Sequence, residues 1–372
     1  MEALVSPTLD SLRTTWSGRR VFITGHTGFK GSWLSLILAD LGAQLWGYSL
    51  PAPTSPSIFE QGGVAGRFQR SWHGPDSDVR DLARLQTAMA EARPEVVLHL
   101  AAQPLVRESY RTPVETFATN VMGTTHLLEA VRHVDSVKAV VVVTTDKVYE
   151  NQEWAWAYRE QDRLGGHDPY SASKACTELV VSSYRDAFEF TQRGVGLASA
   201  RAGNVIGGGD WAADRLVPDV LAALADGRLP DIRRPQAVRP WQHVLEPLIG
   251  YLQLAQALLA SPQTFSQAFN FGPGEQDVRT VGEVLARLQQ LWGGASQGFV
   301  PQASACHEAG LLRLDASLAR QQLGWLPRWG LDQALAACVS WQQAWHQGHP
   351  PDALCLDQWR AYIGAGSALA GP

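Results

Sequence analysis

A short apolar strand that runs through a glycine-rich turn into an apolar helix is the feature that most constrains the fold of this chain. Val21-Phe22-Ile23 is typical of a strand, and residues 24–31 follow with the sequence TGHTGFKG. Apolar residues at helical spacing begin at Trp33, and Gly42 ends the predicted helix. Glycines between a strand and a helix permit a tight turn and the close approach of a pyrophosphate. We therefore interpret this turn as a dinucleotide-binding loop and disfavour the alternative, an ordinary glycine turn.

The same alternation of strand and helix continues along the first part of the chain. Strands are predicted over residues 43–48, 95–100 and 137–143, and helices over residues 82–92 and 121–133. Such alternation implies an α/β fold with a Rossmann-like, doubly wound parallel sheet. Residues 49–77 are rich in Pro, Ser and Gly, which predicts a long loop of functional use.

Beyond about residue 205 the pattern loosens into shorter elements. We expect helices there over residues 217–225, 281–292 and 331–345. The last dozen residues have the composition of a frayed end.

Composition excludes several classes of function. The 372 residues include 31 basic and 36 acidic side chains, a balance without the basic excess of a nucleic-acid binder. The longest apolar runs, such as residues 139–143, fall far short of the ~20 residues of a membrane span, and residues 1–18 lack the apolar core of a signal peptide. The four cysteines show no CxxC spacing, so neither a metal site nor a disulfide framework is predicted. We expect a soluble, cytoplasmic protein without nucleic-acid or membrane partners.

Lysine is unusually scarce in this chain. Only Lys30, Lys138, Lys147 and Lys174 are lysines, so arginine supplies the other basic side chains. Lysine and arginine differ in shape and in titration, so the lysines that remain are expected where an ammonium is specifically needed.

Polar side chains follow the strand predicted over residues 137–143. Thr145, Asp146 and Lys147 come at its carboxyl end, the edge where open parallel sheets bind ligands. Tyr170 and Lys174 follow at i and i+4, on one face of a predicted helix. An ammonium beside the phenol favours phenolate and should lower the tyrosine pKa from ~10 towards neutrality, as a general base requires. The alternative, a surface Tyr/Lys pair, is disfavoured by the glycine loop and by Thr145.

Two other segments are candidates for contact with a dinucleotide. Asp78 and Val79 follow the expected position of a third strand and could reach an adenine, although Asp81 is typical of a helix N-cap. His99 is followed by small residues that leave room for a cofactor or pack in the core. The second strand ends in Gly47-Tyr48-Ser49-Leu50, with neither the carboxylate nor the arginine that would separate NAD from NADP.

These stretches together resemble the extended short-chain dehydrogenase/reductase family, in its nucleotide-sugar branch, and most closely its CDP-glucose 4,6-dehydratases. The resemblance covers about residues 20–345 and rests on Asn120 and on TGHTGFKGSWL (24–34), HLAAQPLVRESY (99–110), VTTDKVYEN (143–151), DPYSASK (168–174), ARAGNVIGGGDW (200–211) and RPWQHV (239–244).

The resemblance implies NAD as a cofactor that is regenerated in each cycle. The positions that match cofactor-binding residues of the family are Gly25, Thr27, Gly28, Phe29, Lys30, Gly31, Asp78, Val79, Leu100, Ala101, Ala102, Gln103, Asn120, Tyr170 and Lys174.

The resemblance also implies the conversion of CDP-D-glucose to CDP-4-dehydro-6-deoxy-D-glucose in deoxysugar biosynthesis. Tyr170 would take the proton of the C4 hydroxyl, Lys174 would lower the tyrosine pKa, and Thr145 would hold the C4 oxygen. Asp146 matches the acid that protonates the departing C6 hydroxyl, and the stored hydride then returns to C6. The related dTDP-glucose dehydratases have glutamate, the C5 base, where Lys147 stands here. Lys147 would need a depressed pKa to act as that base, and otherwise it would stabilise the enolate.

On the substrate side, the resemblance assigns Asn204 and Arg239 to the nucleotide diphosphate. Arg215 and Arg107 are further candidates for the nucleotide and the sugar, and His307 is the nearest counterpart of a second phosphate-binding arginine. We expect an NAD-binding domain over residues 15–203 and roughly 237–272, and a smaller mixed α/β substrate domain over 204–236 and roughly 273–350. A homodimer built on two long helices is common in the family.

Two alternatives remain at this point. A 4-epimerase or decarboxylase of the same family shares Tyr170 and Lys174, but an epimerase needs no acid for a C6 leaving group, which Asp146 would supply. A non-catalytic dinucleotide-binding regulator usually lacks the Tyr/Lys pair.

Overall fold

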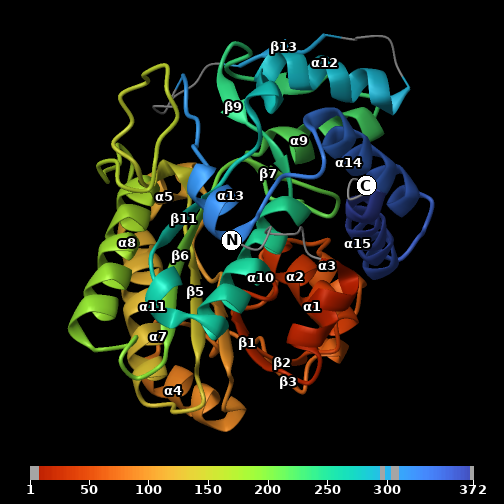
Figure 1. Ribbon diagram of the computed structural model, residues 1–372. Helices are drawn as coiled ribbons and strands as arrows, with labels where there is room; N and C mark the ends of the chain where they lie inside the picture. The colour runs from red at the N-terminus through yellow and green to blue at the C-terminus, as the bar shows by residue number, and fades with distance from the viewer. Residues whose placement is uncertain (1–7, 294–297, 303–309, 369–372) are drawn as a thin grey trace.

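The computed structural model describes residues 8–293, 298–302 and 310–368 of the chain. Its centre is a seven-stranded sheet with the order β11-β6-β5-β4-β1-β2-β3 (Figure 1). The strands of this sheet are β1 (Arg20–Thr24), β2 (Gln44–Tyr48), β3 (Arg70–Trp72), β4 (Val96–His99), β5 (Ala139–Val143), β6 (Gly196–Ala202) and β11 (Ala268–Phe271). All neighbouring strands pair in parallel. The predicted Rossmann-like, doubly wound fold is therefore confirmed.

The strand order reverses at β1, which places a ligand-binding edge beside its carboxyl end. The register aligns Thr24 of β1 with His99 of β4, and His99 with Val142 of β5. Consequently the glycine turn, the segment after His99 and the polar residues after Val143 all leave the sheet at one edge.

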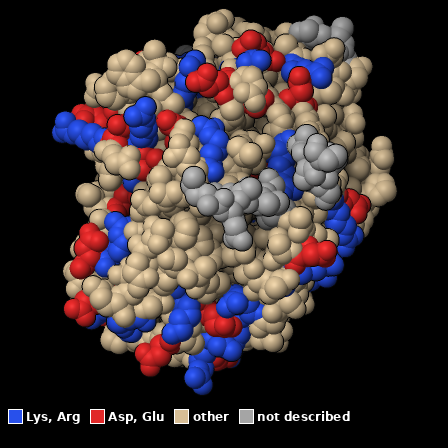
Figure 2. Space-filling view, in the orientation of Figure 1, with Lys and Arg blue, Asp and Glu red and all other residues tan. Residues whose placement is uncertain are grey.

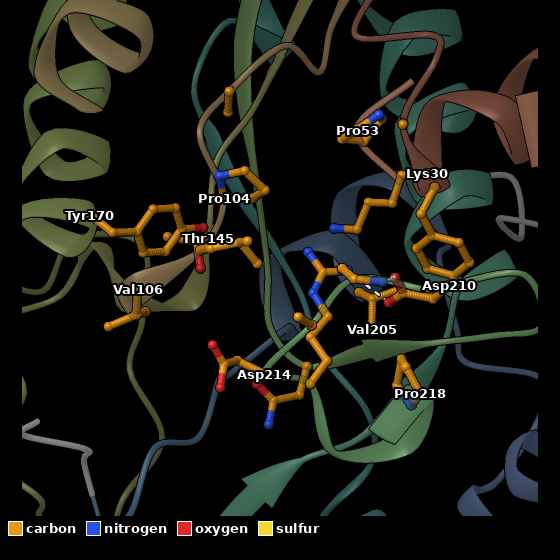
Figure 3. Close-up of a pocket in the computed structure, with 18 of the residues that line it drawn as sticks. Lys30, Pro53, Pro104, Val106, Thr145, Tyr170, Val205, Asp210, Asp214 and Pro218 are labelled. Atoms are coloured by element: carbon orange, nitrogen blue, oxygen red, sulfur yellow. Dashed lines mark hydrogen bonds and ion pairs between the residues drawn. The ribbon is translucent and has the colours of Figure 1, made fainter. Parts of the chain in front are cut away.

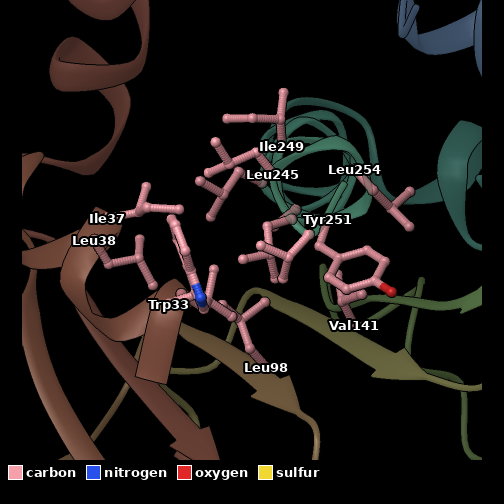
Figure 4. Packing of buried hydrophobic residues seen from close by; sticks show 14 of the residues in the cluster. Trp33, Ile37, Leu38, Leu98, Val141, Leu245, Ile249, Tyr251 and Leu254 are labelled. Carbon is pink, nitrogen blue, oxygen red and sulfur yellow. The ribbon is translucent and has the colours of Figure 1, made fainter. Parts of the chain in front are cut away.

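Helices cover both faces of the sheet, which explains why its central strand β5 is apolar and buried throughout. On one face α2 (Phe29–Asp40) and α10 (Leu245–Ala260) pack against alternate strand residues such as Leu98 and Val141 (Figure 4). On the other face α4 (Leu82–Ala92), α7 (Gly123–Arg132) and α8 (Pro169–Ala187) pack against Phe22, Val97 and Val140. The central strands β1, β4 and β5 thus contribute side chains to both layers.

A smaller group of elements lies beyond the carboxyl edge of the sheet (Figure 1). It includes α9 (Leu216–Ala225), α12 (Val281–Trp292) and α14 (Leu331–His346), which share a separate hydrophobic cluster. Its strands form three pairs: β7 (Val205–Ile206) with β10 (Gln242–His243), β9 (Val238–Pro240) with β12 (Val278–Thr280), and β8 (Asp231–Ile232) with β13 (Val300–Pro301).

The remaining elements are short or peripheral. They are α1 (Leu9–Trp16), α3 (Ile58–Gln61), η1 (Val64–Arg67), α5 (Val106–Arg111), α6 (Pro113–Phe117), the π-helical turn η2 (Ala118–Met122), η3 (Asp146–Val148), α11 (Pro262–Phe265), η4 (Glu275–Asp277), α13 (Ser317–Leu323) and α15 (Pro351–Ala368).

Two expectations about local structure were wrong. Residues 49–77 are not one loop, because they contain α3, η1 and the edge strand β3, which pairs with β2. The chain does not fray from residue 361, because α15 continues to Ala368 and buries Tyr362 fully. Its contacts with the body of the protein stabilise it: the Trp359 indole donates to Asp40 (3.2 Å) and the Tyr362 hydroxyl to Glu246 (2.6 Å).

Charged side chains of both signs are interspersed on the face shown in Figure 2. No helix in the described part of the chain is both long enough and apolar enough to cross a membrane.

Candidate active site

A cleft of about 1490 Å³ lies at the carboxyl edge of the sheet. It is lined by the glycine turn, by the segment after β5, by the first turns of α8 and by loops of the smaller group of elements. Figure 3 shows Tyr170 and Thr145 on one wall, with Lys30 and Asp210 on the other. Among the residues that the structure describes, no cluster of His, Cys, Asp and Glu suitable for a metal ion is found.

The turn between β1 and α2 has the shape of a cradle for a pyrophosphate. Gly25 has a φ of 73°, and a Cβ atom on it would lie 2.6 Å from the backbone nitrogen of Ala101. A Cβ atom on Gly31 would lie 2.1 Å from the carbonyl oxygen of Gly25. Gly28 caps α2 without a side chain, so the N–H groups of the first helical turn are left for an anion. The residues present therefore fit the pyrophosphate of a dinucleotide.

Hydroxyl groups lie where the second strand ends. Thr27 Oγ1 and Ser49 Oγ are 2.8 Å apart, and Thr27 also donates to the carbonyl of Leu50 (3.0 Å). Asp78 and Val79 line the cleft nearby, but the Asp78 carboxylate already accepts hydrogen bonds from the backbone and the guanidinium of Arg80.

The segment after β4 divides into residues that line the cleft and residues that support its wall. Leu100, Ala101 and Ala102 line the cleft. Gln103 and Asn120, predicted to bind the cofactor, lie behind the wall instead. The Asn120 amide accepts from the backbone of Gln103 (2.8 Å) and donates to Ser173 (2.8 Å) on α8. Any effect of these two side chains on a ligand would therefore be indirect.

The predicted Tyr/Lys pair lies against the end of β5. Asp168 caps α8 by accepting from the backbone of Ser171 (2.9 Å). With the N-terminus of α8 fixed in this way, Tyr170 and Lys174 point into the wall of the cleft, and both side chains are buried. The Lys174 ammonium donates to the carbonyl of Val143 (3.1 Å).

Protonation of the pair differs from the expectation. Burial raises the pKa of Tyr170 to about 12, although hydrogen bonding to Thr145 and the charge of Arg215 oppose that rise. Burial lowers the pKa of Lys174 to about 8, with Glu178 opposing. The predicted lowering of the Tyr170 pKa is thus not produced by the described residues, because the phenol is buried and Lys174 is directed to Val143.

Asp146 supplies a buried carboxylate beside Thr145. Its Oδ1 accepts from the Thr145 hydroxyl (3.0 Å), whereas its buried Oδ2 has no hydrogen-bond partner in the described structure. A Cβ atom on Gly203 would lie 2.0 Å from Oδ2, so glycine is what leaves room for this carboxylate. Lys147 follows at the same rim, half-buried. A buried carboxyl group and a half-buried amine are thus adjacent at the end of β5.

Of the predicted substrate-binding residues, Asn204, Arg215 and Arg239 belong to segments beyond the edge of the sheet, whereas Arg107 lies on α5, which contacts α8, on the side of Thr145 and Tyr170. Asn204, Arg107, Arg215 and Arg239 all line the cleft. Arg215 forms an ion pair with Asp210 (2.7 Å), and Arg239 donates to the carbonyl of Val238 (2.9 Å). His307 lies within residues 303–309, outside the described part of the chain.

Two groups of charged residues near the cleft were not predicted from the sequence. Asp214 forms ion pairs with Arg107 (3.0 Å) and Arg233 (2.9 Å), and all three line the cleft. Glu178 and Arg201 form a buried ion pair (2.9 Å) behind it. Only Glu178 had a signal in the sequence, since it stands one helical turn after Lys174.

Comparisons with known proteins agree with this arrangement. The model of the family described as "GDP-mannose 4,6 dehydratase" matches residues 22–338. A CDP-glucose 4,6-dehydratase of Salmonella typhimurium is 52% identical over 337 residues, which cover 90% of this chain and 93% of that protein.

Solved structures with the same fold include dehydratases. DesIV, a dTDP-glucose 4,6-dehydratase of Streptomyces venezuelae with NAD bound, has a TM-score of 0.74 at 24% identity and covers 90% of this chain and 99% of its own. MoeE5 in complex with UDP-glucose and NAD has a TM-score of 0.73 at 23% identity, covering 88% and 99%. The resemblance to nucleotide-sugar short-chain dehydrogenases/reductases is confirmed, and the chain belongs to the GDP-mannose 4,6-dehydratase family.

Proposed function

We propose that this protein is an NAD-dependent CDP-glucose 4,6-dehydratase that forms CDP-4-dehydro-6-deoxy-D-glucose for deoxysugar biosynthesis. The observation that carries this proposal is the 52% identity to the Salmonella enzyme over 90% of the chain. The cleft supports it by bringing a base, an acid and a cradle for a dinucleotide into one space.

NAD supplies the chemistry of hydride acceptance and return when it is bound. The residues that we propose to hold it line the cleft: the glycine turn from Gly25 to Gly31, Asp78 and Val79, and the segment from Leu100 to Ala102, with Tyr170 and Lys174 at its far end. Gln103 and Asn120 hold this wall from behind.

Tyr170 and Thr145 act on the C4 hydroxyl in the first step. The Tyr170 oxygen takes the hydroxyl proton as C4 becomes a ketone, and Thr145 hydrogen-bonds the C4 oxygen. Because burial raises the pKa of Tyr170 to about 12, the phenolate needs stabilisation as it forms, which we assign to the Thr145 hydroxyl and the charge of Arg215, with the ammonium of Lys174 nearby.

Asp146 and Lys147 act on C6 and C5 in the second step. The new ketone acidifies the C5 proton, and Asp146 donates a proton to the C6 hydroxyl, which leaves as water. Lys147 either takes the C5 proton as a neutral amine or stabilises the enolate by its charge. An epimerase needs no such pair.

The nucleotide sugar occupies the opposite wall. Asn204 and Arg239 hold the diphosphate, since a planar guanidinium suits phosphate. Arg215 and Arg107 line the nucleotide and sugar positions, and His307 remains a prediction. We assign residues 15–203 and roughly 237–272 to the NAD-binding domain and 204–236 and roughly 273–350 to the substrate domain, supported by the separate hydrophobic cluster of the smaller part.

A homodimer is supported by exposed apolar side chains on neighbouring helices. Val114 on α6 and Leu179 on α8 are 74% and 60% exposed, and Tyr110, Phe117 and Met122 lie on the adjoining segments. Helices α6 and α8 contact one another, so these side chains can form one face. We also propose a cytoplasmic location, in keeping with the free thiols of Cys176, Cys338 and Cys355.

A substrate panel tests the proposed function. Purified protein with NAD is incubated separately with CDP-, dTDP-, UDP- and GDP-glucose, and the 4-keto-6-deoxy product is measured by mass spectrometry. Product from CDP-glucose in preference to the others supports the proposal. No product from CDP-glucose would overturn its substrate, and no product from any of them would overturn the dehydratase activity.

A further inference from the structure

The backbone of Lys30 lies on the cofactor side of the cleft, whereas its side chain extends towards the reaction site. It is the second residue of α2, directly after the glycine turn. Figure 3 shows its side chain reaching across the cleft towards the wall that carries Thr145 and Tyr170, with Asp210 close by. Lys30 therefore lies at the boundary between the space for a dinucleotide and the space for a nucleotide sugar.

The ammonium of Lys30 has no hydrogen bond or ion pair with any residue that the structure describes. The two carboxylates nearest in its surroundings are engaged elsewhere: Asp210 pairs with Arg215 at 2.7 Å, and Asp146 accepts from Thr145 at 3.0 Å. A half-buried cation without a partner gains from an anion that binds beside it. The chemical class that this cleft is built to take, a diphosphate, supplies such an anion.

The charges around Lys30 come from four elements. Arg215 precedes α9 and Lys174 lies on α8, whereas Asp146 begins η3 and Asp210 follows β7. Burial and the two cations lower the pKa of Lys30 to about 7, and the two carboxylates oppose that fall. Lys30 is consequently partly uncharged at neutral pH, and an anion that binds beside it will draw a proton onto it.

We propose that Lys30 is a shared cation for the diphosphates of the cofactor and of the nucleotide sugar, so that the binding of either one strengthens the binding of the other. This inference rests on the proposed function, because it takes NAD and a nucleoside diphosphate as the two ligands. The first ligand to bind draws the proton onto Lys30, and the second meets an ammonium that is already formed. Without this cation the two diphosphates would only repel one another.

The size of the coupling follows from the protonation equilibrium. With a pKa of about 7, Lys30 is protonated in roughly one molecule in ten at pH 8. The first ligand must therefore protonate Lys30 as it binds, which weakens its affinity by up to ~10-fold, whereas the second ligand binds to a Lys30 that is already protonated. The coupling should reach ~10-fold at pH 8 and nearly vanish at pH 6, where Lys30 is already charged.

Calorimetric titration tests this with protein freed of bound nucleotide. NAD is titrated at pH 6 and pH 8, with and without saturating CDP, which carries the diphosphate but cannot react. Each titration is repeated in buffers of different ionisation enthalpy, which gives the number of protons taken up. Lys30→Met removes the charge, and Lys30→Arg keeps a charge that never titrates. Lys138→Met, at the exposed residue directly before β5, is the matched control.

The proposal predicts that NAD binding to the wild type at pH 8 takes up close to one proton, and that CDP then raises the NAD affinity ~10-fold. Lys30→Arg should take up no proton and show no pH-dependent coupling, and Lys30→Met should bind both ligands more weakly and without positive coupling. Equal coupling at pH 6 and pH 8, or a Lys30→Arg protein with the wild-type proton uptake, would overturn the role of Lys30. Failure of CDP to bind, with proton uptake on NAD binding intact, would instead overturn the proposed nucleotide and with it the shared role.

Discussion

The ammonium of Lys174 donates a 3.1 Å hydrogen bond to the carbonyl oxygen of Val143, the last residue of β5. This bond fastens α8 to the strand that delivers Thr145 and Asp146 to the cleft. The positions of Tyr170, Asp146 and Thr145, which we propose as the base, the acid and the residue that holds the C4 oxygen, therefore depend on one junction between a helix and a strand.

Replacement of Tyr170 by phenylalanine tests the base. Because the phenol oxygen is the proposed acceptor of the C4 proton, kcat should fall by ~10²–10⁴-fold, while the affinity for NAD changes little. The measurement pairs steady-state product formation with NAD titration. Wild-type turnover in Tyr170→Phe would exclude Tyr170 as the base.

The pH dependence of turnover reports on Lys174, which must remain an ammonium. Burial, opposed by Glu178, lowers the Lys174 pKa to about 8, so kcat should fall as the pH rises through that value. Lys174→Arg, if active, should lose this fall because arginine does not titrate there. Glu178→Gln removes the charge that raises the Lys174 pKa, so the fall should move to lower pH. A profile that is flat through pH 8 in the wild type contradicts this assignment.

Lys147→Glu tests the residue whose role in the second step is open. Turnover should be impaired, whereas the affinity for CDP should stay near the wild-type value, because the proposed role of Lys147 is at C5 of the sugar and not at the nucleotide. Kinetics with CDP-glucose and titration with CDP separate the two effects. Unchanged turnover would remove Lys147 from the mechanism.

Gly203→Ala should damage the site through Asp146. The new methyl group would lie 2.0 Å from Asp146 Oδ2, so the carboxylate must move, and the loss of water from C6 should slow more than the oxidation at C4. Gly74→Ala is the control, because a Cβ atom there meets nothing within 4 Å. Equal turnover of the two variants would show that the position of Asp146 is unimportant.

The buried pair of Glu178 and Arg201 should matter for stability. Glu178 also accepts from Thr144 (2.5 Å) and Ser199 (2.6 Å), and both partners of the ion pair are 4% exposed. Glu178→Gln leaves the Arg201 charge buried and unpaired, which should lower the free energy of unfolding by ~3–5 kcal/mol. Urea unfolding measures it, and Glu150→Gln, whose pair with Arg163 is exposed, should cost only ~0–1 kcal/mol.

Much of the fold could be predicted because its signals are local. The helix over residues 82–92 follows from its apolar spacing and the Asp81 cap. The turn from Gly25 to Gly31 follows from its glycines, because a Cβ atom on Gly25 or Gly31 would clash with the backbone. Strand β3 has three residues and takes its shape from pairing with β2, and α15 is held by Asp40 and Glu246, more than a hundred residues away in sequence. Such elements leave little periodicity to detect.

The site was predictable where one motif carries the chemistry and unpredictable where charges from separate segments meet. Thr145, Asp146, Tyr170 and Lys174 are found in the cleft, as expected from strand-end position and helical spacing. The protonation state of Tyr170 and the ion pairs of Asp214 depend on burial and tertiary distance, which spacing does not encode.

The fate of the hydrogen on C4 tests the central claim most directly. CDP-glucose carrying deuterium at C4 is incubated with the protein and NAD, and the product is analysed by NMR spectroscopy. A 4,6-dehydratase moves this hydrogen, so the account predicts a 4-keto-6-deoxy product with the deuterium at C6. Deuterium that stays at C4 in a sugar that keeps its C6 hydroxyl would contradict the account and identify an epimerase.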